Sequence, residues 1–306
     1  MKNTLLYALT VLIWGSTWFA IEFQLGEVAV EVSLVYRFGM AAAIMWVYCL
    51  WQSVPLGFSL RNHGFIALLA LGNFSANYVL MYLAQGYLTS AMTSIAFSTL
   101  LLMNIINTRL FFGKKIASRV YVGACLGILG IVALFWNDLR AVRLSGQSLL
   151  GLWLVLGGTL AASLGNMTSV RNSNHGLNIF AVNAWGMLYG TLALSLFAWL
   201  NGSEFIISYR TSYLVSLLYL SVFGTVIAFA SYFVLLKNLG PEKASYVIVL
   251  FPFVAVTLSS LYEGFVWTTS ITIGFALVLL GNLILLTPTA KIMNLLSSRK
   301  QAMEKE

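Results

Sequence analysis

Charged residues are scarce in this sequence. They make up 8% of the 306 residues, whereas hydrophobic residues make up 60% and the mean hydropathy is +0.89. A soluble domain has about a quarter of its residues charged, and one core could not bury this much apolar surface. The composition therefore excludes a soluble globular protein and indicates a polytopic membrane protein that contacts the lipid bilayer.

Cysteine and histidine are also rare, at two residues each. Cys49 and Cys125 fall inside long apolar runs, where burial is a simpler interpretation than a disulfide or a metal site. His63 and His175 lie at or beyond the ends of such runs, and no His-Glu-x-x-His motif occurs. No base is therefore placed beside a nucleophile within the membrane, and the sequence predicts no enzyme, no metal and no cofactor.

The apolar runs are about 20 residues long, which is enough to cross ~30 Å of hydrocarbon as a helix. They show no alternation typical of a barrel, so the prediction is an all-α fold. The first run continues past Lys2 without an Ala-x-Ala site and is taken as a span, not a removable signal. The ten predicted transmembrane helices are 4–22, 31–52, 63–84, 88–112, 117–136, 148–170, 178–200, 212–237, 243–263 and 268–287.

Basic residues gather on one side of these spans. With the N-terminus in the cytoplasm, all but four of the 17 Lys and Arg residues fall on the cytoplasmic side, the exceptions being Arg37, Arg140, Arg143 and Arg210. Loops rich in Lys and Arg stay in the cytoplasm, so both termini are predicted to lie inside. The net charge of +8 is then a topology signal, and no nucleic-acid partner is predicted.

The chain contains an internal repeat. A shift of 151 positions places Gly113 on Gly264, Gly123 on Gly274 and Gly130 on Gly281. Ten spans give five per copy, and because five is odd the copies must face opposite ways, which is the inverted-repeat plan of secondary transporters. The predicted units are a first five-helix repeat at 1–136, a linker at 137–147, a second repeat at 148–287 and a basic cytoplasmic tail at 288–306.

Four segments carry a resemblance to a known family: LTVLIWGSTWFAIEF in the first span, Tyr36-Arg37-Phe38 in the second, LTSAMTSIAFSTLLL in the fourth and LGPEKASYVIVLFPFVAVTLSSLYEG in the ninth. In this order and spacing, the chain resembles the EamA type of the drug/metabolite transporter superfamily over essentially its whole length. The resemblance implies a ten-helix carrier of the bacterial inner membrane that exports small metabolites, such as amino acids or toxic compounds.

The sequence departs from the family in the fourth span. The family often has a proline in both the fourth and the ninth span, but this chain has Leu101 opposite Pro252. It also has Lys114 after Gly113, where the family commonly has glutamate. We therefore expect a gating hinge at Pro252 in the second half alone.

Polar and aromatic groups inside spans are the candidate substrate-binding residues, because lipid penalises them unless they face protein or water. In the third span, Asn73 and Asn77 share a face beside Tyr78 and are interpreted as a cavity wall. The alternative is that they join neighbouring helices. In the fourth span, Ser94 lies on a stripe of small residues beside Phe97, and close helix packing is the competing interpretation.

Trp14 and Trp18 lie one turn apart in the first span. Trp14 is too deep for an interfacial tryptophan, so we interpret it as an aromatic group facing a cavity. The repeat pairs it with Gly165, next to Asn166, and Tyr232 and Tyr246 are expected to add aromatic surface from the second half. Ordinary aromatic packing is the alternative for each.

Acidic residues are almost absent from the spans. Glu22 ends the first span, and Arg37 lies about two turns into the second on the same side of the membrane. We expect Arg37 to pair with Glu22, Glu27 or Glu31. The alternative is that it faces the cavity and binds a carboxylate. Without a carboxylate at mid-span, proton coupling is poorly supported, and a route through Glu22 remains the one coupling candidate.

The glycines of the fifth and tenth spans indicate close helix packing. A weak homodimer through Gly123-x-x-x-Gly127 is an alternative to a monomer. The sequence as a whole predicts a secondary transporter that exports small amphiphilic metabolites, such as amino acids, by alternating access. The alternatives are a multidrug exporter, a channel or facilitator, and an importer of small metabolites.

Overall fold

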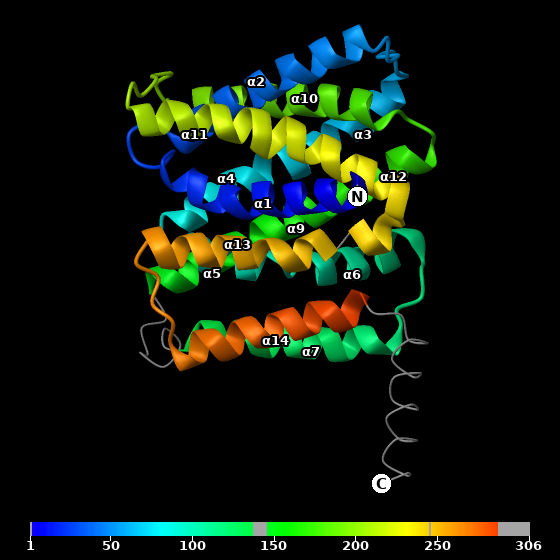
Figure 1. Cartoon of the computed structure of the whole chain (residues 1–306). Coiled ribbons are helices and arrows are strands. Elements are labelled where there is room, and N and C mark those ends of the chain that lie inside the picture. The colour runs from blue at the N-terminus through cyan, green and yellow to red at the C-terminus, as the bar shows by residue number, and fades with distance from the viewer. Residues whose placement is uncertain (1, 137–145, 245, 287–306) are drawn as a thin grey trace.

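The computed structural model describes residues 2–136, 146–244 and 246–286, and within these ranges every regular element is a helix (Figure 1). The first half comprises α1 (Lys2–Glu22), α2 (Val30–Trp51), α3 (Leu60–Ala70), η1 (Leu71–Ala76), α4 (Asn77–Gln85), α5 (Ser90–Phe97), α6 (Leu100–Phe112) and α7 (Ser118–Leu134). The second half comprises α9 (Gln147–Asn174), α10 (Ile179–Leu200), α11 (Thr211–Ser221), η2 (Val222–Ile227), α12 (Ala228–Ala244), α13 (Tyr246–Tyr262) and α14 (Thr269–Leu286). The predicted linker lies outside the described residues except for its last two positions, and the tail at 288–306 lies outside them entirely.

These elements form the ten predicted membrane helices. Eight spans are long and apolar enough to cross a bilayer, with α3, η1 and α4 forming one of them and α5 and α6 another. α7 and α13 are apolar but shorter, at 17 residues each. The chain is therefore an all-α polytopic membrane protein, as the composition predicted.

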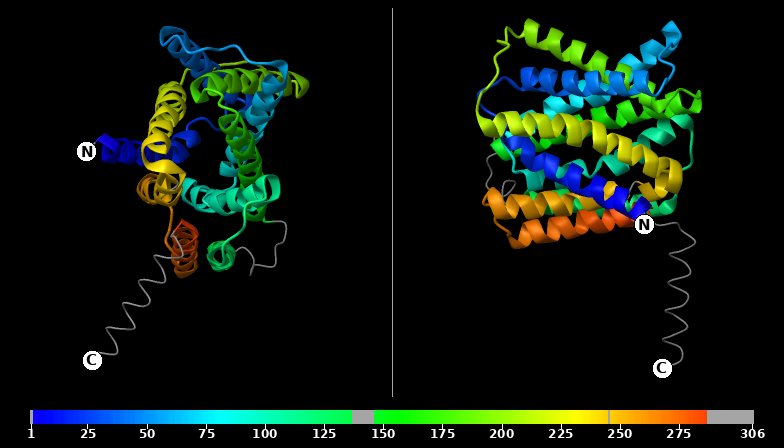
Figure 2. Two further views of the ribbon diagram at one scale, coloured as in Figure 1. Left: turned by 90° about the vertical axis from the view of Figure 1, so that its right-hand side faces the viewer. Right: turned by 45° about the horizontal axis from the view of Figure 1, so that its top comes forward.

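The helix contacts repeat between the two halves. α1 packs against α12 and α13, and its counterpart α9 packs in the same way against α4 and α6. α2 packs against α10, and α7 against α14, so each of these helices meets its own repeat partner. Figures 1 and 2 show the α7–α14 pair at one edge of the bundle. Equivalent helices making equivalent contacts is the arrangement expected of two inverted five-helix repeats.

The repeated glycines form the contact between α7 and α14. A Cβ atom on Gly123 would lie 2.8 Å from the carbonyl oxygen of Gly281, and one on Gly130 would lie 2.8 Å from that of Gly274. These backbones touch because no side chain separates them. Gly123 is thus occupied by a contact within the chain, so a homodimer through Gly123-x-x-x-Gly127 would require α14 to separate from α7.

Two π-helical segments occur at equivalent positions of the repeats, and the apolar pattern of the sequence does not predict them. Shifting η1 by 151 residues places Leu71 on Val222 and Ala76 on Ile227, the bounds of η2. In η1 the Ser75 hydroxyl donates to the carbonyl of Ala70 at 3.2 Å, and in η2 the Thr225 hydroxyl donates to that of Leu220 at 2.8 Å. Both hydroxyls reach five residues back, as the wider π turn allows. Such segments often occur at functional sites.

The structure shows a helix break in the first half, and the gating hinge expected at Pro252 stays a prediction. The fourth predicted helix is interrupted between α5 and α6 at Ser98 and Thr99, whereas α13 continues through Pro252. The hydroxyls of Ser98 and Thr99 donate to the carbonyls three residues earlier, at 2.6 and 2.7 Å. Such side-chain bonds compete with the helical ladder, and the backbone here makes i to i−3 bonds. Serine and threonine therefore interrupt this helix without a proline.

Candidate functional site

A cavity of about 630 Å³ lies at the centre of the bundle. Both halves line it, and each of the ten spans contributes except those formed by α7 and α14. Its size is in the range that holds a small molecule. At one end it is bordered by Lys114, Lys115 and Val170, which lie where helices end on one face of the protein. We call this the basic face; Arg61, Arg109, Arg119 and Arg171 are among the other basic residues at the helix ends on this side.

A row of asparagines forms one wall of the cavity. The Nδ2 of Asn73 donates to the Oδ1 of Asn166 at 3.2 Å, and the Nδ2 of Asn166 donates to the Oδ1 of Asn104 at 3.3 Å. The row joins η1, α9 and α6, and all three residues line the cavity. The asparagine amides therefore join neighbouring helices and also face the cavity. Both interpretations offered by the sequence, a cavity wall and a bond between helices, describe this geometry.

Trp14 lies on the opposite wall and packs against aromatic groups from α12. Its ring centroid is 5.4 Å from that of Phe229 and 5.0 Å from that of Tyr232. All three residues line the cavity. α1 of the first half and α12 of the second thus supply one continuous aromatic surface.

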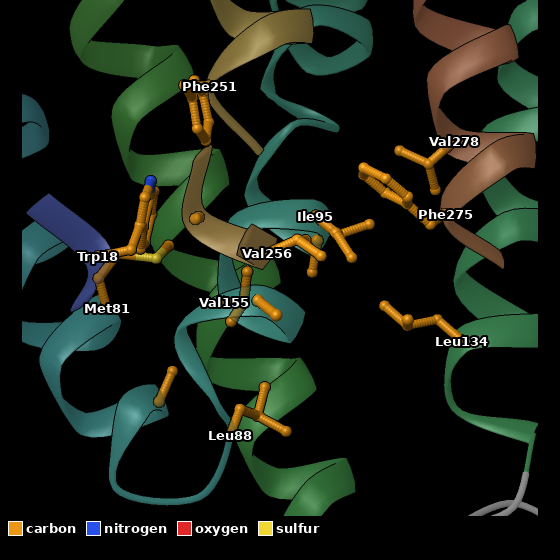
Figure 3. Close-up of a cluster of buried hydrophobic side chains, with 14 of the residues drawn as sticks. Trp18, Met81, Leu88, Ile95, Leu134, Val155, Phe251, Val256, Phe275 and Val278 are labelled. Carbon is orange, nitrogen blue, oxygen red and sulfur yellow. The ribbon is translucent and has the colours of Figure 1, made fainter. Parts of the chain in front are cut away.

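Three further aromatic rings close the deep end of the cavity. Trp18 lies 5.2 Å from Phe97 and 5.9 Å from Phe251, measured between ring centroids. We call Trp18, Phe97 and Phe251 the aromatic floor. Figure 3 shows Trp18 and Phe251 within the buried apolar cluster that continues past Ile95 and Val256 to Phe275 on α14. The floor therefore rests on a packed core.

Some predicted residues lie outside the cavity. Ser94 is fully buried and donates to the carbonyl of Ala91 at 2.8 Å, which agrees with the packing interpretation. Tyr246 packs with a separate apolar cluster that contains Leu101 and Val249. Pro252 is buried inside α13, next to the floor residue Phe251. Neither Ser94 nor Tyr246 lines the cavity in this conformation.

The structure corrects the expected pairing of Arg37 with a glutamate. Arg37 is 1% exposed and lines the cavity, and its Nε and Nη1 donate to Thr225 Oγ1 at 3.3 Å and Tyr82 OH at 3.1 Å. The three nearby glutamates have other partners: Gln85 for Glu22, Arg210 and Ser208 for Glu27, and Ser203 and Asn201 for Glu31. The sequence placed all four residues near the same end of the spans but did not show the direction of each side chain.

A polar network joins the two halves beyond the aromatic floor. The Glu263 carboxylate accepts hydrogen bonds from the Ser90 backbone N–H at 3.0 Å, from the Ser90 hydroxyl and from the Ser259 hydroxyl at 2.6 Å. The Gln85 amide donates to the Trp18 carbonyl at 2.8 Å, to Ser90 Oγ at 3.2 Å and to Glu22 at 3.4 Å. We call Glu22, Gln85, Ser90 and Glu263 the latch. It lies at the helix ends opposite the basic face, and the bond from Gln85 to the Trp18 carbonyl joins it to the aromatic floor.

Sequence reasoning identified Glu22 of the latch as a coupling candidate. It missed Gln85, Ser90 and Glu263, as well as wall residues such as Phe229, Phe251 and Asn183. The three missed latch residues lie at the ends of spans, where polar residues are common. Their residue type therefore did not mark them as functional. Phe229 and Phe251 are two of 20 phenylalanines, and only the helix packing distinguishes them from lipid-facing ones. The part of the chain that the structure describes holds no cluster of His, Cys, Asp and Glu suited to a metal.

Comparison with known proteins agrees with this geometry. The chain is 24% identical over 252 residues to an uncharacterized transporter of Buchnera aphidicola subsp. Schizaphis graminum, covering 82% of this chain and 83% of that one. It is 22% identical over 266 residues to protein PagO of Salmonella typhimurium, covering 87% and 86%. It is 27% identical over 258 residues to the uncharacterized inner membrane transporter YedA of Escherichia coli K12, covering 83% and 80%.

A solved crystal structure has the same fold, with a TM-score of 0.66 and 15% identity over 92% of this chain and 96% of that one. The model of the EamA-like transporter family matches residues 1–136 and 149–287. These two ranges cover nearly all of the described helices. The chain belongs to the EamA-like transporter family.

Proposed function

We propose that this transporter exports small amphiphilic metabolites, such as amino acids, across the inner membrane by alternating access. One observation carries the proposal: a cavity lined by both halves reaches the basic face at one end and meets the aromatic floor at the other, and the latch joins the two halves behind that floor. A cavity with one closed end is what alternating access requires, whereas a channel needs a continuous path.

The lining supports an amphiphilic substrate. Aromatic rings of α1, α12 and α13 give apolar contact, and the asparagine row offers amide donors and acceptors on another wall. Small-molecule sites commonly combine apolar walls with a few polar groups that fix orientation. A molecule with an apolar side chain and a polar head would satisfy both surfaces.

Two features favour export. Lys and Arg mark the cytoplasmic side of membrane proteins, so the basic face, to which the cavity reaches, is expected to face the cytoplasm. The latch also lacks a counterpart at the basic face: the 151-residue shift places Phe112 at the position of Glu263 and Pro241 at that of Ser90. Phenylalanine cannot accept these hydrogen bonds, and proline has no N–H to donate. The resting protein is then expected to hold its outer end closed and to take substrate from the cytoplasm.

Uptake by proteoliposomes, measured for a panel of amino acids, nucleobases and cationic drugs with and without a pH gradient, tests this proposal. We expect saturable transport of at least one class of amino acid. Transport confined to cationic drugs would support the multidrug alternative and contradict the proposal. Comparing uptake with and without the pH gradient shows whether protons drive the transport.

A further inference from the structure

Arg37 is a buried charge on the cavity wall. It lies on α2, and its side chain is 1% exposed. A guanidinium stays protonated at any physiological pH. Within a membrane such a charge is costly unless an anion or several hydrogen bonds compensate for it, and it usually marks a functional site.

The partners of Arg37 are all neutral. Two of its three nitrogens donate to the hydroxyls of Thr225 and Tyr82, and its guanidinium carbon lies 4.7 Å from the ring centroid of Tyr78. The third nitrogen, Nη2, has no hydrogen-bond partner among the described residues, and neither does Arg37 have a carboxylate within ion-pair distance there. The guanidinium is therefore held in place on one side, while its Nη2 donor is unpaired and no anion among the described residues neutralises its charge.

Asn77 offers a complementary group in the lining of the same cavity. Its Oδ1 is buried without a hydrogen-bond partner, the residue is 7% exposed, and it lines the same cavity next to Tyr78, which stacks on Arg37. Buried polar atoms are nearly always paired, so an unpaired acceptor in a cavity wall indicates a missing donor. A free donor on Arg37 and a free acceptor on Asn77 match a carboxylate and an ammonium group.

The charge of the cavity lining also favours an anionic group on the bound molecule. Among the described residues that line the cavity, the charged side chains are Arg37, Lys114 and Lys115, and none is acidic. Lysines at the entrance and an arginine inside attract anions and repel cations.

We propose that Arg37 binds the carboxylate of the transported molecule and that Asn77 Oδ1 accepts a hydrogen bond from its ammonium group, with the apolar side chain on the aromatic floor. The inference rests on the proposed function and narrows its substrate class to carboxylates and amino acids, to the exclusion of cationic amphiphiles.

Ligand-induced thermal stabilisation of the purified protein tests this with three probes that share a phenyl body: 3-phenylpropionate, L-phenylalanine and phenethylamine. The two carboxylates are expected to raise Tm, and the amine is not. Arg37→Gln is expected to weaken apparent binding of both carboxylates by about tenfold or more, which corresponds to loss of a charge-assisted hydrogen bond. Arg37→Lys should retain part of the binding, and Asn77→Ala should weaken phenylalanine more than phenylpropionate.

Arg61→Gln, which removes an exposed charge outside the cavity, is the matched control and should leave the stabilisation unchanged. Stabilisation by phenethylamine, no stabilisation by either carboxylate, or an undiminished effect in Arg37→Gln would overturn the inference. If Arg37→Gln does not fold, the three probes on the unmodified protein still decide. Because this experiment measures binding, a failed transport assay would contradict the proposed function but would leave the conclusion about carboxylate binding by Arg37 unchanged.

Discussion

The Glu263 carboxylate accepts hydrogen bonds from both the backbone N–H and the hydroxyl of Ser90, which lies 173 residues earlier in the chain. This relationship ties the start of α5 in the first half to the end of α13 in the second. The carboxylate also lies at a helix N-terminus, where negative charge is favourable. In the proposed alternating-access cycle this bond would break when the end of the cavity away from the basic face opens, so its strength is expected to affect which conformation is populated.

We therefore expect Glu263→Gln to shift the protein toward the outward-open conformation. Charge-assisted hydrogen bonds contribute about 1.5–3 kcal/mol each, and a loss of ~1.4 kcal/mol changes a population about tenfold. A cysteine at the buried cavity residue Ile21, in a Cys49→Ala, Cys125→Ser background, reports the opening. Its labelling by an impermeant maleimide from outside should be about tenfold faster in Glu263→Gln.

Glu27→Gln is the matched control for this substitution. Hydrogen bonds from Ser208 and then Arg210 lower the pKa of Glu27, so Glu27 is a carboxylate at neutral pH, but its ion pair is exposed. Exposed ion pairs contribute little. Faster labelling in both variants, or in neither, would show that the latch does not hold the outer end closed.

Trp14→Ala and Asn77→Ala are each expected to abolish transport while the protein remains in the membrane. Trp14 joins α1 to α12 in the cavity wall, and Asn77 carries an unpaired acceptor. Uptake by proteoliposomes containing equal amounts of protein checks this. Trp153→Ala, on the lipid-facing side of α9 where the side chain is 70% exposed, should transport normally. Normal uptake by Trp14→Ala and Asn77→Ala would refute their assignment to the site.

The asparagine row can be tested as substrate contact or as helix packing alone. Asn73→Ala and Asn166→Ala are expected to raise KM, whereas bonds between membrane helices are worth only ~0.6 kcal/mol in stability. Asn107→Ala is the control, because Asn107 makes the same kind of bond to Ser163, at 2.9 Å, between α6 and α9 but does not line the cavity. It should lower Tm slightly with an unchanged KM. An equally unchanged KM in all three variants would leave the row a purely structural feature.

Two glycines of α7 should respond differently to the same substitution. Gly123→Ala places a methyl group against the backbone of Gly281, and such overpacking costs about 1–3 kcal/mol. A Cβ atom on Gly127 would have nothing within 4 Å, so Gly127→Ala is expected to be neutral or to stabilise by up to about 1 kcal/mol. Thermal unfolding in detergent measures both. Equal Tm values would contradict the close contact of α7 with α14.

The fold could be predicted from the sequence because two of its patterns extend over many residues. Apolar runs of about 20 residues specify membrane helices, and the glycine spacing from Gly113 to Gly130 recurs 151 residues later. The breaks within helices could not be predicted in the same way. Ser98 and Thr99 interrupt a helix through their hydroxyls, and the π turns of η1 and η2 alter the spacing that periodicity arguments assume.

For the candidate site, the depth of a residue within its span could be read from the sequence and was informative. The direction of each side chain could not be predicted. Trp14 and Asn77 were found because aromatic and amide groups deep in a span are unusual. Ser94 has the same favourable depth but turns to its own helix, and Arg37 turns to Thr225 in place of a glutamate. Contacts between the halves, such as that of Ser90 with Glu263, depend on the packing of distant helices and leave no local pattern.

Counterflow in proteoliposomes tests alternating access around one cavity most directly. Vesicles loaded with an unlabelled amino acid that is transported should accumulate its labelled form transiently above equilibrium, and the L enantiomer should be preferred over the D enantiomer. The account predicts this overshoot, since one site exchanges substrate between the two sides. Non-saturable equilibration without overshoot or preference would identify a pore and contradict the account.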